Sequence, residues 1–326
     1  MISELLESFA GLPVADFAGS GTDATDLPPA DAVAWRLASD FGEDRTFEQL
    51  WREFLETVPA DRIRAIVIGA WWGEGGYENV RPVLDLLTES AGRLPALRSL
   101  FIGDVTGEQC ELSWLEMADV TPVVEAYPLL EEFVVRGCGY GGPEEALAFR
   151  PVRHERLRRL RFESGGLPAS VVRAVCDSEL PRLEHLALWL GIDQYGGDAT
   201  LADLAPLLAG GRFPELSHLG LQNSEIQDEI AAAVAAAPVV AQLTSLDLSM
   251  GVLTDVGAEA LLGGQPLTHL MLLDLHHHYL SEKLAQRVRD ALESSGVEVD
   301  LSEQQRAQRF EWDDSNEEHR YVAVSE

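Results

Sequence analysis

The sequence predicts an α/β solenoid, with parallel strands on a concave face and helices on a convex face. The first observation is a pattern of apolar-x-x-apolar-x-apolar that recurs at steps of about 26 to 34 residues. The second is a proline two residues before the pattern in four repeats, where it would stop the preceding helix. The third is a proline expected to open a short helix at Pro82, Pro122 and Pro206.

The repeated pattern places one strand in each repeat. The eight patterns begin at Ile63, Leu97, Leu130, Leu157, Leu183, Leu216, Leu243 and Leu270. Parallel strands stack about 4.8 Å apart, whereas packed helices need about 8–10 Å, so the stack must curve with the strands inside. Alternate strand residues then face the concave surface, and the leucines between them form one buried column. That column is expected to include Leu160, Leu186, Leu219 and Leu246.

The chain divides into a cap, a repeat region and a tail. Residues 1–60 are expected to cap the first repeat with a strand over 32–37 and a helix over 46–58. Thr46 and Gln49 form a capping box at the start of that helix. Residues 61–301 hold about eight repeats and end in a helix over 281–292 and a last strand over 297–301. Residues 302–326 are expected to be an acidic, partly mobile tail, of which residues 321–324 are expected to dock back as a strand.

One segment resembles a known repeat family closely. Residues 246–258 read Leu-Asp-Leu-Ser-Met-Gly-Val-Leu-Thr-Asp-Val-Gly-Ala, which is similar to a standard leucine-rich repeat of the ribonuclease-inhibitor-like or bacterial type. The resemblance covers about residues 60–301 and implies a right-handed α/β horseshoe. The asparagine that this family places after the strand is missing from every repeat. The resemblance implies a fold and names no ligand.

Charge and cysteine content exclude several function classes. The sequence contains 24 lysine and arginine residues and 55 aspartate and glutamate residues, which gives a net charge of −31. This charge disfavours nucleic acid and anionic membranes as partners. No signal peptide or spanning segment is evident. Cys110, Cys138 and Cys176 are odd in number and lack metal-ligand spacing, so neither disulfides nor a zinc site is expected. These features predict a cytoplasmic protein.

The expected concave face carries a candidate binding surface. Arginine binds carboxylates and phosphates bidentately, and tryptophan is a frequent interface anchor. The alternative is that Glu132, Glu155 and Glu163 neutralise the arginines within the fold. The candidate partner-binding residues are Arg136, Arg159, Arg161, Glu163, Trp189, Gln222, Asp247, Asp274 and His276.

Glycine-rich loops after the strands form a second candidate surface. Tyr77, Tyr140, Tyr195 and Asp198 lie in such loops in the longer repeats. Insertions along one rim of a solenoid are often its binding face, and ordinary turn chemistry is the alternative.

Metal, cofactor and catalytic motifs are weak. Asp247, Asp274 and His276 could gather around a divalent ion, although solvated polar residues on a sheet explain them as well. His278 should point inward. The glycine pattern at residues 137–142 is followed by two glutamates where a phosphate would have to lie, so no cofactor is expected. No P-loop, HExxH or GxSxG motif occurs.

The leading hypothesis is a non-catalytic scaffold that recognises a protein or peptide through its concave sheet and loop rim. Its partner would be basic or would carry an exposed carboxylate. One alternative is an accessory, substrate-binding component of a peptide or small-molecule tailoring pathway. The other is a metal-dependent enzyme that uses Asp247, Asp274 and His276.

Overall fold

One sheet runs through the molecule, and each strand in it pairs with its neighbours in the chain. The computed structural model describes residues 2–19, 27–42, 45–73, 77–139, 141–142, 145–309 and 318–325. Within these ranges the sheet has twelve strands, and only the first pair, β1–β2, is antiparallel. The strands are β1 (Ser8–Phe9), β2 (Leu12–Asp16), β3 (Ala34–Leu37), β4 (Ala65–Ile68), β5 (Ser99–Ile102), β6 (Glu132–Arg136), β7 (Arg159–Glu163), β8 (His185–Gly191), β9 (His218–Ser224), β10 (Ser245–Asp247), β11 (Leu272–Asp274) and β12 (Glu298–Asp300).

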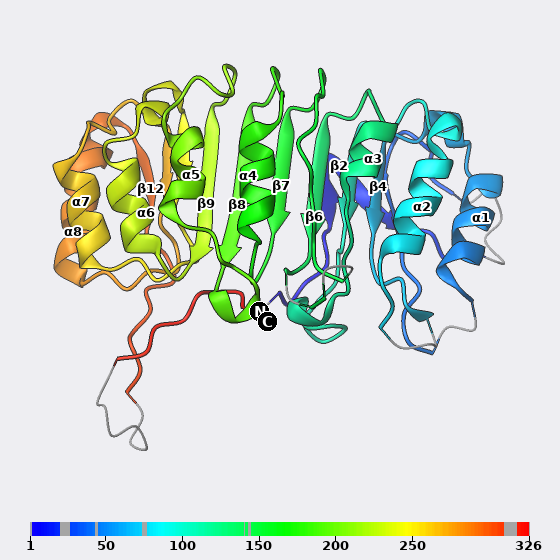
Figure 1. Ribbon diagram of the computed structural model, residues 1–326, viewed down its shortest axis with the longest axis horizontal. Coiled ribbons are helices and arrows are strands. Elements are labelled where there is room, and N and C mark those ends of the chain that lie inside the picture. The colour runs from blue at the N-terminus through cyan, green and yellow to red at the C-terminus, as the bar shows by residue number, and fades with distance from the viewer. Residues whose placement is uncertain are drawn as a thin grey trace.

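Helices cover one face of this sheet. Figure 1 shows them in front of the strands, and the ends of the sheet lie behind its middle. The helices are α1 (Phe47–Thr57), α2 (Arg81–Glu89), α3 (Thr121–Ala126), α4 (Ala169–Asp177), α5 (Leu201–Leu208), α6 (Gln227–Val234), α7 (Asp255–Gly263) and α8 (Glu282–Leu292). The predicted α/β solenoid is therefore confirmed, and it is consistent with a leucine-rich-repeat-like arrangement.

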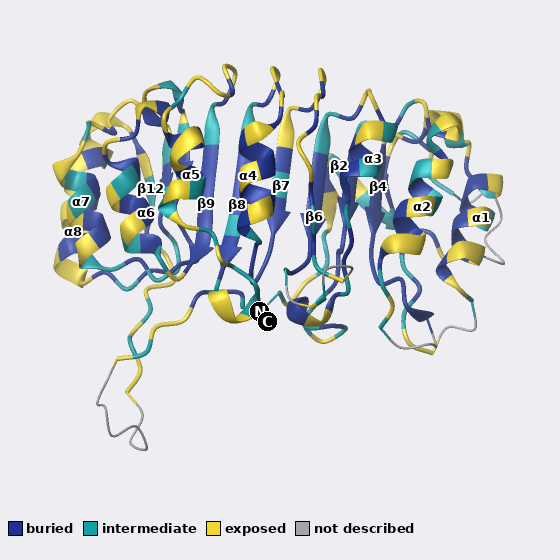
Figure 2. Cartoon of the chain, in the orientation of Figure 1, coloured by how far each residue is buried: buried dark blue, intermediate teal, exposed yellow. Residues whose placement is uncertain are grey.

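The core lies between the strands and the helices. Leu160, Leu186, Leu219 and Leu246 stand opposite one another on β7 to β10, and all four side chains are 0% exposed. Figure 2 shows the same division, with dark blue strands behind helices whose outer surfaces are yellow. The predicted strand register is therefore correct in these repeats.

Helix starts follow local capping chemistry, with one correction. The Thr46 and Gln49 capping box is present at α1, and Pro82 and Pro122 lie in the first turns of α2 and α3. Pro206 was expected to open its helix but lies inside α5. Thr200 forms the capping box of α5 and starts the helix earlier, and the proline removes only one backbone hydrogen bond.

The N-terminal residues form a hairpin that the sequence did not predict. Phe9 is buried, and its ring lies 5.9 Å from that of Phe101 on β5. Val67 and Val134, on the strands either side of β5, belong to the same buried cluster. The amide of Gly107 donates to the carbonyl of Ile2 (2.8 Å). This segment covers the face of β4 to β6 that lies opposite the helices.

The C-terminal residues pack back across the loops that follow β9 and β10. Val324 donates its amide to Oδ1 of Asn223 (3.0 Å), and Ala323 donates to the carbonyl of Met250 (2.8 Å). Residues 321–324 therefore dock back as expected, but they do not form the expected strand. Gln305 donates its amide to the carbonyl of His278 (2.7 Å), so this part of the expected mobile tail is held. Residues 310–317 lie outside the described ranges.

A substitution in the leucine column should destabilise the whole stack. Leu186→Ala removes a fully buried side chain and leaves a cavity, so we expect the free energy of unfolding to fall by about 2–5 kcal/mol. Denaturant titration measures the loss. Leu129→Ala, at a side chain that is 41% exposed, is the control and should change little. Equal effects of the two substitutions would contradict the register of the sheet.

Candidate functional site

The concave face is open over its C-terminal half, where no hairpin covers it in the described part of the chain. One row of side chains crosses six neighbouring strands there, from β7 to β12. In register, the row consists of Arg161, Ala187, Gly220, Asp247, Asp274 and Asp300. It begins with a base, passes two small residues and ends with three acids. The surface is therefore electrically asymmetric along the solenoid.

Two of the predicted binding residues are engaged inside the fold. Arg136 is only 5% exposed, and its Nε lies 2.8 Å from Glu163 Oε2. Its Nη1 donates to the carbonyl of Val105 (2.9 Å). Glu163 is 3% exposed and also pairs with Arg161 (2.9 Å), which is the internal neutralisation given above as the alternative. Because both side chains are buried and paired within the fold, Arg136 and Glu163 are not accessible to a partner.

Other predicted residues of this surface remain accessible. Arg159 is exposed, and within the described ranges its guanidinium has no ion-pair partner at contact distance. The side chain of Arg161 is 35% exposed, and Trp189 is half-buried. Gln222 is buried and donates to Ser249 Oγ (3.2 Å), which removes it from the predicted surface. Burial raises the pKa of the nearby Glu132 carboxyl. The positive charges of Arg159 and Arg161 reduce this rise.

The remaining arginines of this region are matched internally, as the alternative explanation held. Arg158 donates two hydrogen bonds to one carboxylate oxygen of Glu184 and one to the other. Arg150 pairs with Asp119 at 2.7 Å. These ion pairs lie off the concave row and leave Arg161, together with Arg159 two residues before it on β7, as the basic end of the surface.

The sequence patterns did not predict a stacked pair of histidines on β8 and β9. The rings of His185 and His218 lie 3.8 Å apart with an angle of 1° between their planes. Burial, to which the positive charge of the nearby Arg161 adds, lowers the pKa of His185 to about 3 and that of His218 to about 4. Both rings are neutral at pH 7. The signal available was their identical position in successive repeats.

The acidic end of the row contains carboxylates on neighbouring strands. Burial, together with the charge of Asp274, raises the pKa of Asp247 to about 6. Asp274 Oδ1 lies 2.8 Å from His276 Nδ1 and raises the pKa of that imidazole. As predicted, His276 lies on the partly exposed side of the sheet and His278 is buried.

The candidate metal ligands group differently from the prediction. Ligand atoms of Asp274, His276 and Asp300 lie within 4.8 Å of one another. Asp247 instead accepts hydrogen bonds from the amide and hydroxyl of Ser249. β12 brings Asp300 beside Asp274, so Asp300 takes the place that the sequence assigned to Asp247.

The predicted rim residues do not converge. Tyr77 packs against Trp72, with ring centroids 5.3 Å apart. The carbonyl of Tyr195 accepts from Cys138 Sγ (2.9 Å), and Asp198 Oδ1 accepts from the amide of Ala169 at the start of α4 (2.7 Å). Tyr140 lies outside the described residues. The loops that carry Tyr77 and Tyr195 follow β4 and β8, which are four strand spacings or about 19 Å apart.

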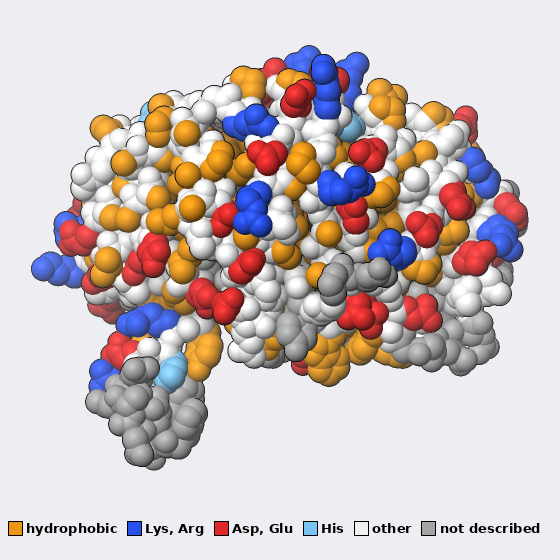
Figure 3. All heavy atoms as spheres, viewed as in Figure 1, with side chains coloured by type: hydrophobic (Ala, Val, Ile, Leu, Met, Phe, Trp, Pro, Cys, Tyr) orange, Lys and Arg blue, Asp and Glu red, His pale blue; other side chains and the backbone are white. Residues whose placement is uncertain are grey.

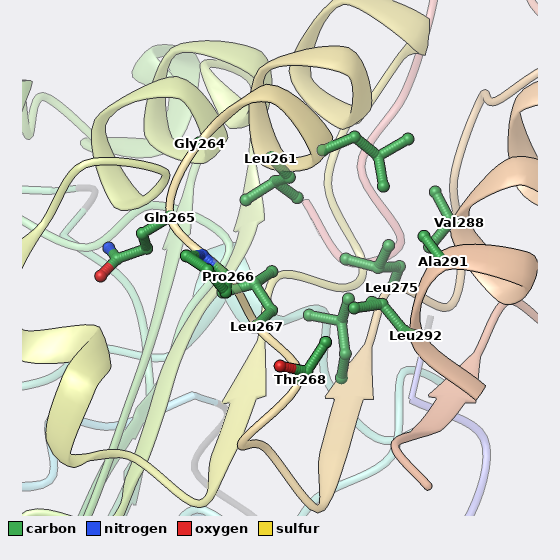
Figure 4. A pocket seen from close by; sticks show the side chains of 12 residues that line it. Leu261, Gly264, Gln265, Pro266, Leu267, Thr268, Leu275, Val288, Ala291 and Leu292 are labelled. Carbon is green, nitrogen blue, oxygen red and sulfur yellow. The ribbon is translucent and has the colours of Figure 1, made fainter. Parts of the chain in front are cut away.

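An apolar pocket lies on the helix side of the sheet, between α7 and α8. Its volume is about 230 Å³, and Figure 4 shows Leu261, Leu267, Leu275, Val288 and Leu292 around it. Gln265, at its edge, already donates to the carbonyls of Val234 and Ala237. Because specific ligand sites combine apolar walls with convergent polar groups, this pocket does not compete with the concave row as the candidate site.

The raised pKa of Asp247 predicts a pH-dependent cost to stability. A carboxyl whose folded pKa lies above its unfolded value stabilises the fold at low pH and loses that contribution as pH rises through about 6. We expect Asp247→Asn to increase the free energy of unfolding by about 1–3 kcal/mol at pH 8 relative to its effect at pH 3. Denaturant titrations at both pH values measure this difference.

Asp300→Asn is the control with the opposite sign. Hydrogen bonds from Ser302 lower the pKa of Asp300, so its charge stabilises the fold at neutral pH. Its replacement should not stabilise the protein at pH 8. If Asp247→Asn changes the free energy of unfolding equally at both pH values, ionisation of the Asp247 carboxyl does not destabilise the fold.

None of the described helices combines the length and apolar character needed to cross a membrane.

The chain is similar in fold and sequence to a solved structure of a bacterial protein. No family model and no curated protein matches the sequence. A crystal structure of a Bacteroides fragilis protein from the Northeast Structural Genomics Consortium matches with a TM-score of 0.72 and 32% sequence identity. The match covers 79% of this chain and 70% of that chain, and this chain therefore belongs to the same family as the Bacteroides fragilis protein.

Proposed function

We propose that the chain is a recognition scaffold of the leucine-rich repeat type that binds a segment of another protein or a peptide. The binding surface is the open half of the concave face. The observation that carries this proposal is the row from Arg161 to Asp300, in which opposite charges flank a floor of Ala187 and Gly220. On the helix side, by contrast, basic and acidic side chains are interspersed (Figure 3).

The spacing of the charges defines the partner. Strands lie about 4.8 Å apart, so Arg161 is about 14 Å from Asp247 and about 24 Å from Asp300 along the sheet. An extended chain spans about 3.3–3.6 Å per residue, which makes these distances about four to seven residues. The partner would carry an acidic group over Arg159 and Arg161 and a basic group over the three aspartates. Trp189 supplies apolar contact beside the row.

The neutral histidines favour such a dipolar ligand. His185 and His218 lie between the basic and acidic ends and carry no charge at pH 7, because burial lowers their pKa values to about 3 and about 4. They therefore add no competing charge to the centre of the surface. The net charge of −31 also attracts a basic partner and repels nucleic acid.

A binding role without catalysis accounts for the cysteines as well. Cys110, Cys138 and Cys176 are all buried. Burial raises the pKa of Cys110 to about 12 and that of Cys176 to about 11, so both thiols stay protonated and poorly nucleophilic. Free thiols also fit the reducing cytoplasm, which we propose as the location of the protein.

Selection from a random heptapeptide library tests the proposal. We expect the enriched peptides to carry an acidic and a basic residue about four to six positions apart, which is the part of the derived spacing that a heptapeptide can span. Arg159→Ala and Asp274→Asn should each weaken the binding of these peptides by about ten-fold or more. Isothermal titration of purified variants measures the change. Arg159 is preferred to Arg161 for this test, since removing Arg161 would also break its pairing with the buried Glu163.

The matched control is Arg158→Gln, one residue away. Its side chain pairs with Glu184 and is not part of the concave row, so peptide affinity should not change. Enriched peptides that bind all three variants like the unmodified protein would show that the concave row is not the binding surface.

A further inference from the structure

Two large aromatic side chains are exposed on the rim of the sheet. Phe41 is 51% exposed and Trp114 is 54% exposed. They lie on the loops that follow β3 and β5, at the carboxyl ends of the strands. Figure 3 shows hydrophobic side chains gathered at the lower edge of the molecule, the edge that the strand arrows of Figure 1 point toward. Exposed aromatic residues in a cluster indicate an interaction site more strongly than isolated ones do.

The two exposed rings belong to one ordered cluster. Tyr77 lies between them, with its ring centroid 5.3 Å from that of Phe41 and 5.8 Å from that of Trp114, both edge to face. The Tyr77 hydroxyl donates to the carbonyl of Gln109 (3.2 Å). Tyr77 is thus held in place by its hydrogen bond, and it in turn positions the exposed rings of Phe41 and Trp114.

A buried tryptophan fixes the inner side of this cluster. Trp72 is 2% exposed and packs edge to face against Tyr77 at 5.3 Å. Its indole Nε1 donates to Asp40 Oδ1 (3.0 Å), and Gln109 Nε2 donates to Asp40 Oδ2 (2.6 Å). Asp40 thus brings a carboxylate to the edge of the aromatic surface and orients it.

The charges around the cluster are negative. Burial is the main cause that raises the pKa values of Tyr77 and Cys110, and the negative charges of Asp40 and Glu111 contribute to both shifts. The guanidinium of Arg45, which is close in sequence, points elsewhere and binds Glu53 and the carbonyl of Ala18. Aromatic faces attract cations, and a neighbouring carboxylate adds to that attraction.

We propose that Phe41, Tyr77 and Trp114, together with Asp40, form a rim site that binds an arginine or lysine side chain of a protein partner. The inference deepens the recognition function proposed above by naming the chemistry of a second contact. The rim site follows β3 to β5, whereas the open concave row begins at β7, at least two strand spacings or about 10 Å away. Each surface is therefore tested by its own variants.

The probe is the peptide acetyl-Gly-Gly-Arg-Gly-Gly-amide, added to protein labelled with ¹⁵N at its tryptophan indoles. We expect it to shift the Trp114 indole resonance in a saturable manner. The same peptide with citrulline keeps the shape of arginine without its charge, and it should bind at least about five-fold more weakly. Phe41→Ala and Trp114→Ala should each weaken arginine-peptide binding by a similar factor, followed for Trp114→Ala at the remaining indole resonances.

Met271→Ala is the control variant, because Met271 is a 72% exposed apolar side chain at the other end of the solenoid. It should leave peptide binding unchanged. Equal binding of the arginine and citrulline peptides, no binding by either, or full affinity in both rim variants would overturn the rim site. Binding that is lost in Asp274→Asn but kept in Trp114→Ala would also overturn it, while supporting the concave row. Failure of the concave-row variants in the heptapeptide test would leave the rim result unaffected.

Discussion

The difference between strand spacing and helix spacing is the constraint on which the rest of the structure depends. Parallel strands need about 4.8 Å each and helices about 8–10 Å, so a sheet with helices on one side must curve away from them. Columns of leucine and other apolar residues bury the helix-facing side of β3 to β11, and the repeats themselves do not cover the other side. A curved sheet of this length thus presents a concave surface that the repeats do not cover. This surface must either be covered by another segment of the chain or be polar enough to stay exposed to water.

One half of the concave surface is covered by the chain itself, and the other half is exposed to water. Over β4 to β6 the surface is apolar, and the β1–β2 hairpin covers it with Phe9 at the centre. The Asp104 carboxylate ties this cover down, because it accepts from the amide of Leu6 (3.3 Å) and pairs with Arg36 (2.9 Å). Over β7 to β12 the surface is polar and can remain in water. The uncovered half is therefore the surface that we propose as the binding site.

Electrostatics in the open half differ from those elsewhere in the molecule. Most arginines near β7 are neutralised by an acid one repeat away, as Arg158 is by Glu184. In the concave row the acids lie beside one another on consecutive strands, and burial together with the charge of Asp274 raises the pKa of Asp247 to about 6. Like charges on adjacent strands cost stability, and a basic group from a partner would relieve that cost. At the rim, Asp40 is placed beside exposed rings, which offers the same kind of partner a second contact.

The sequence by itself determined the repeat, the strand register, the helix-facing core and the face on which Arg159, Arg161, Asp247 and Asp274 lie. These properties depend on periodicity, which is local and repeats along the chain. Only the tertiary structure decided which of those residues are accessible: Arg136, Glu163 and Gln222 are buried by neighbours about one repeat away, and Phe9 covers strands about 60 to 125 residues further along the chain. It also replaced Asp247 by Asp300 in the Asp–His cluster and joined Phe41, Tyr77 and Trp114 from three separate loops. Contacts between such distant residues depend on how the repeats stack and curve, which no local pattern encodes.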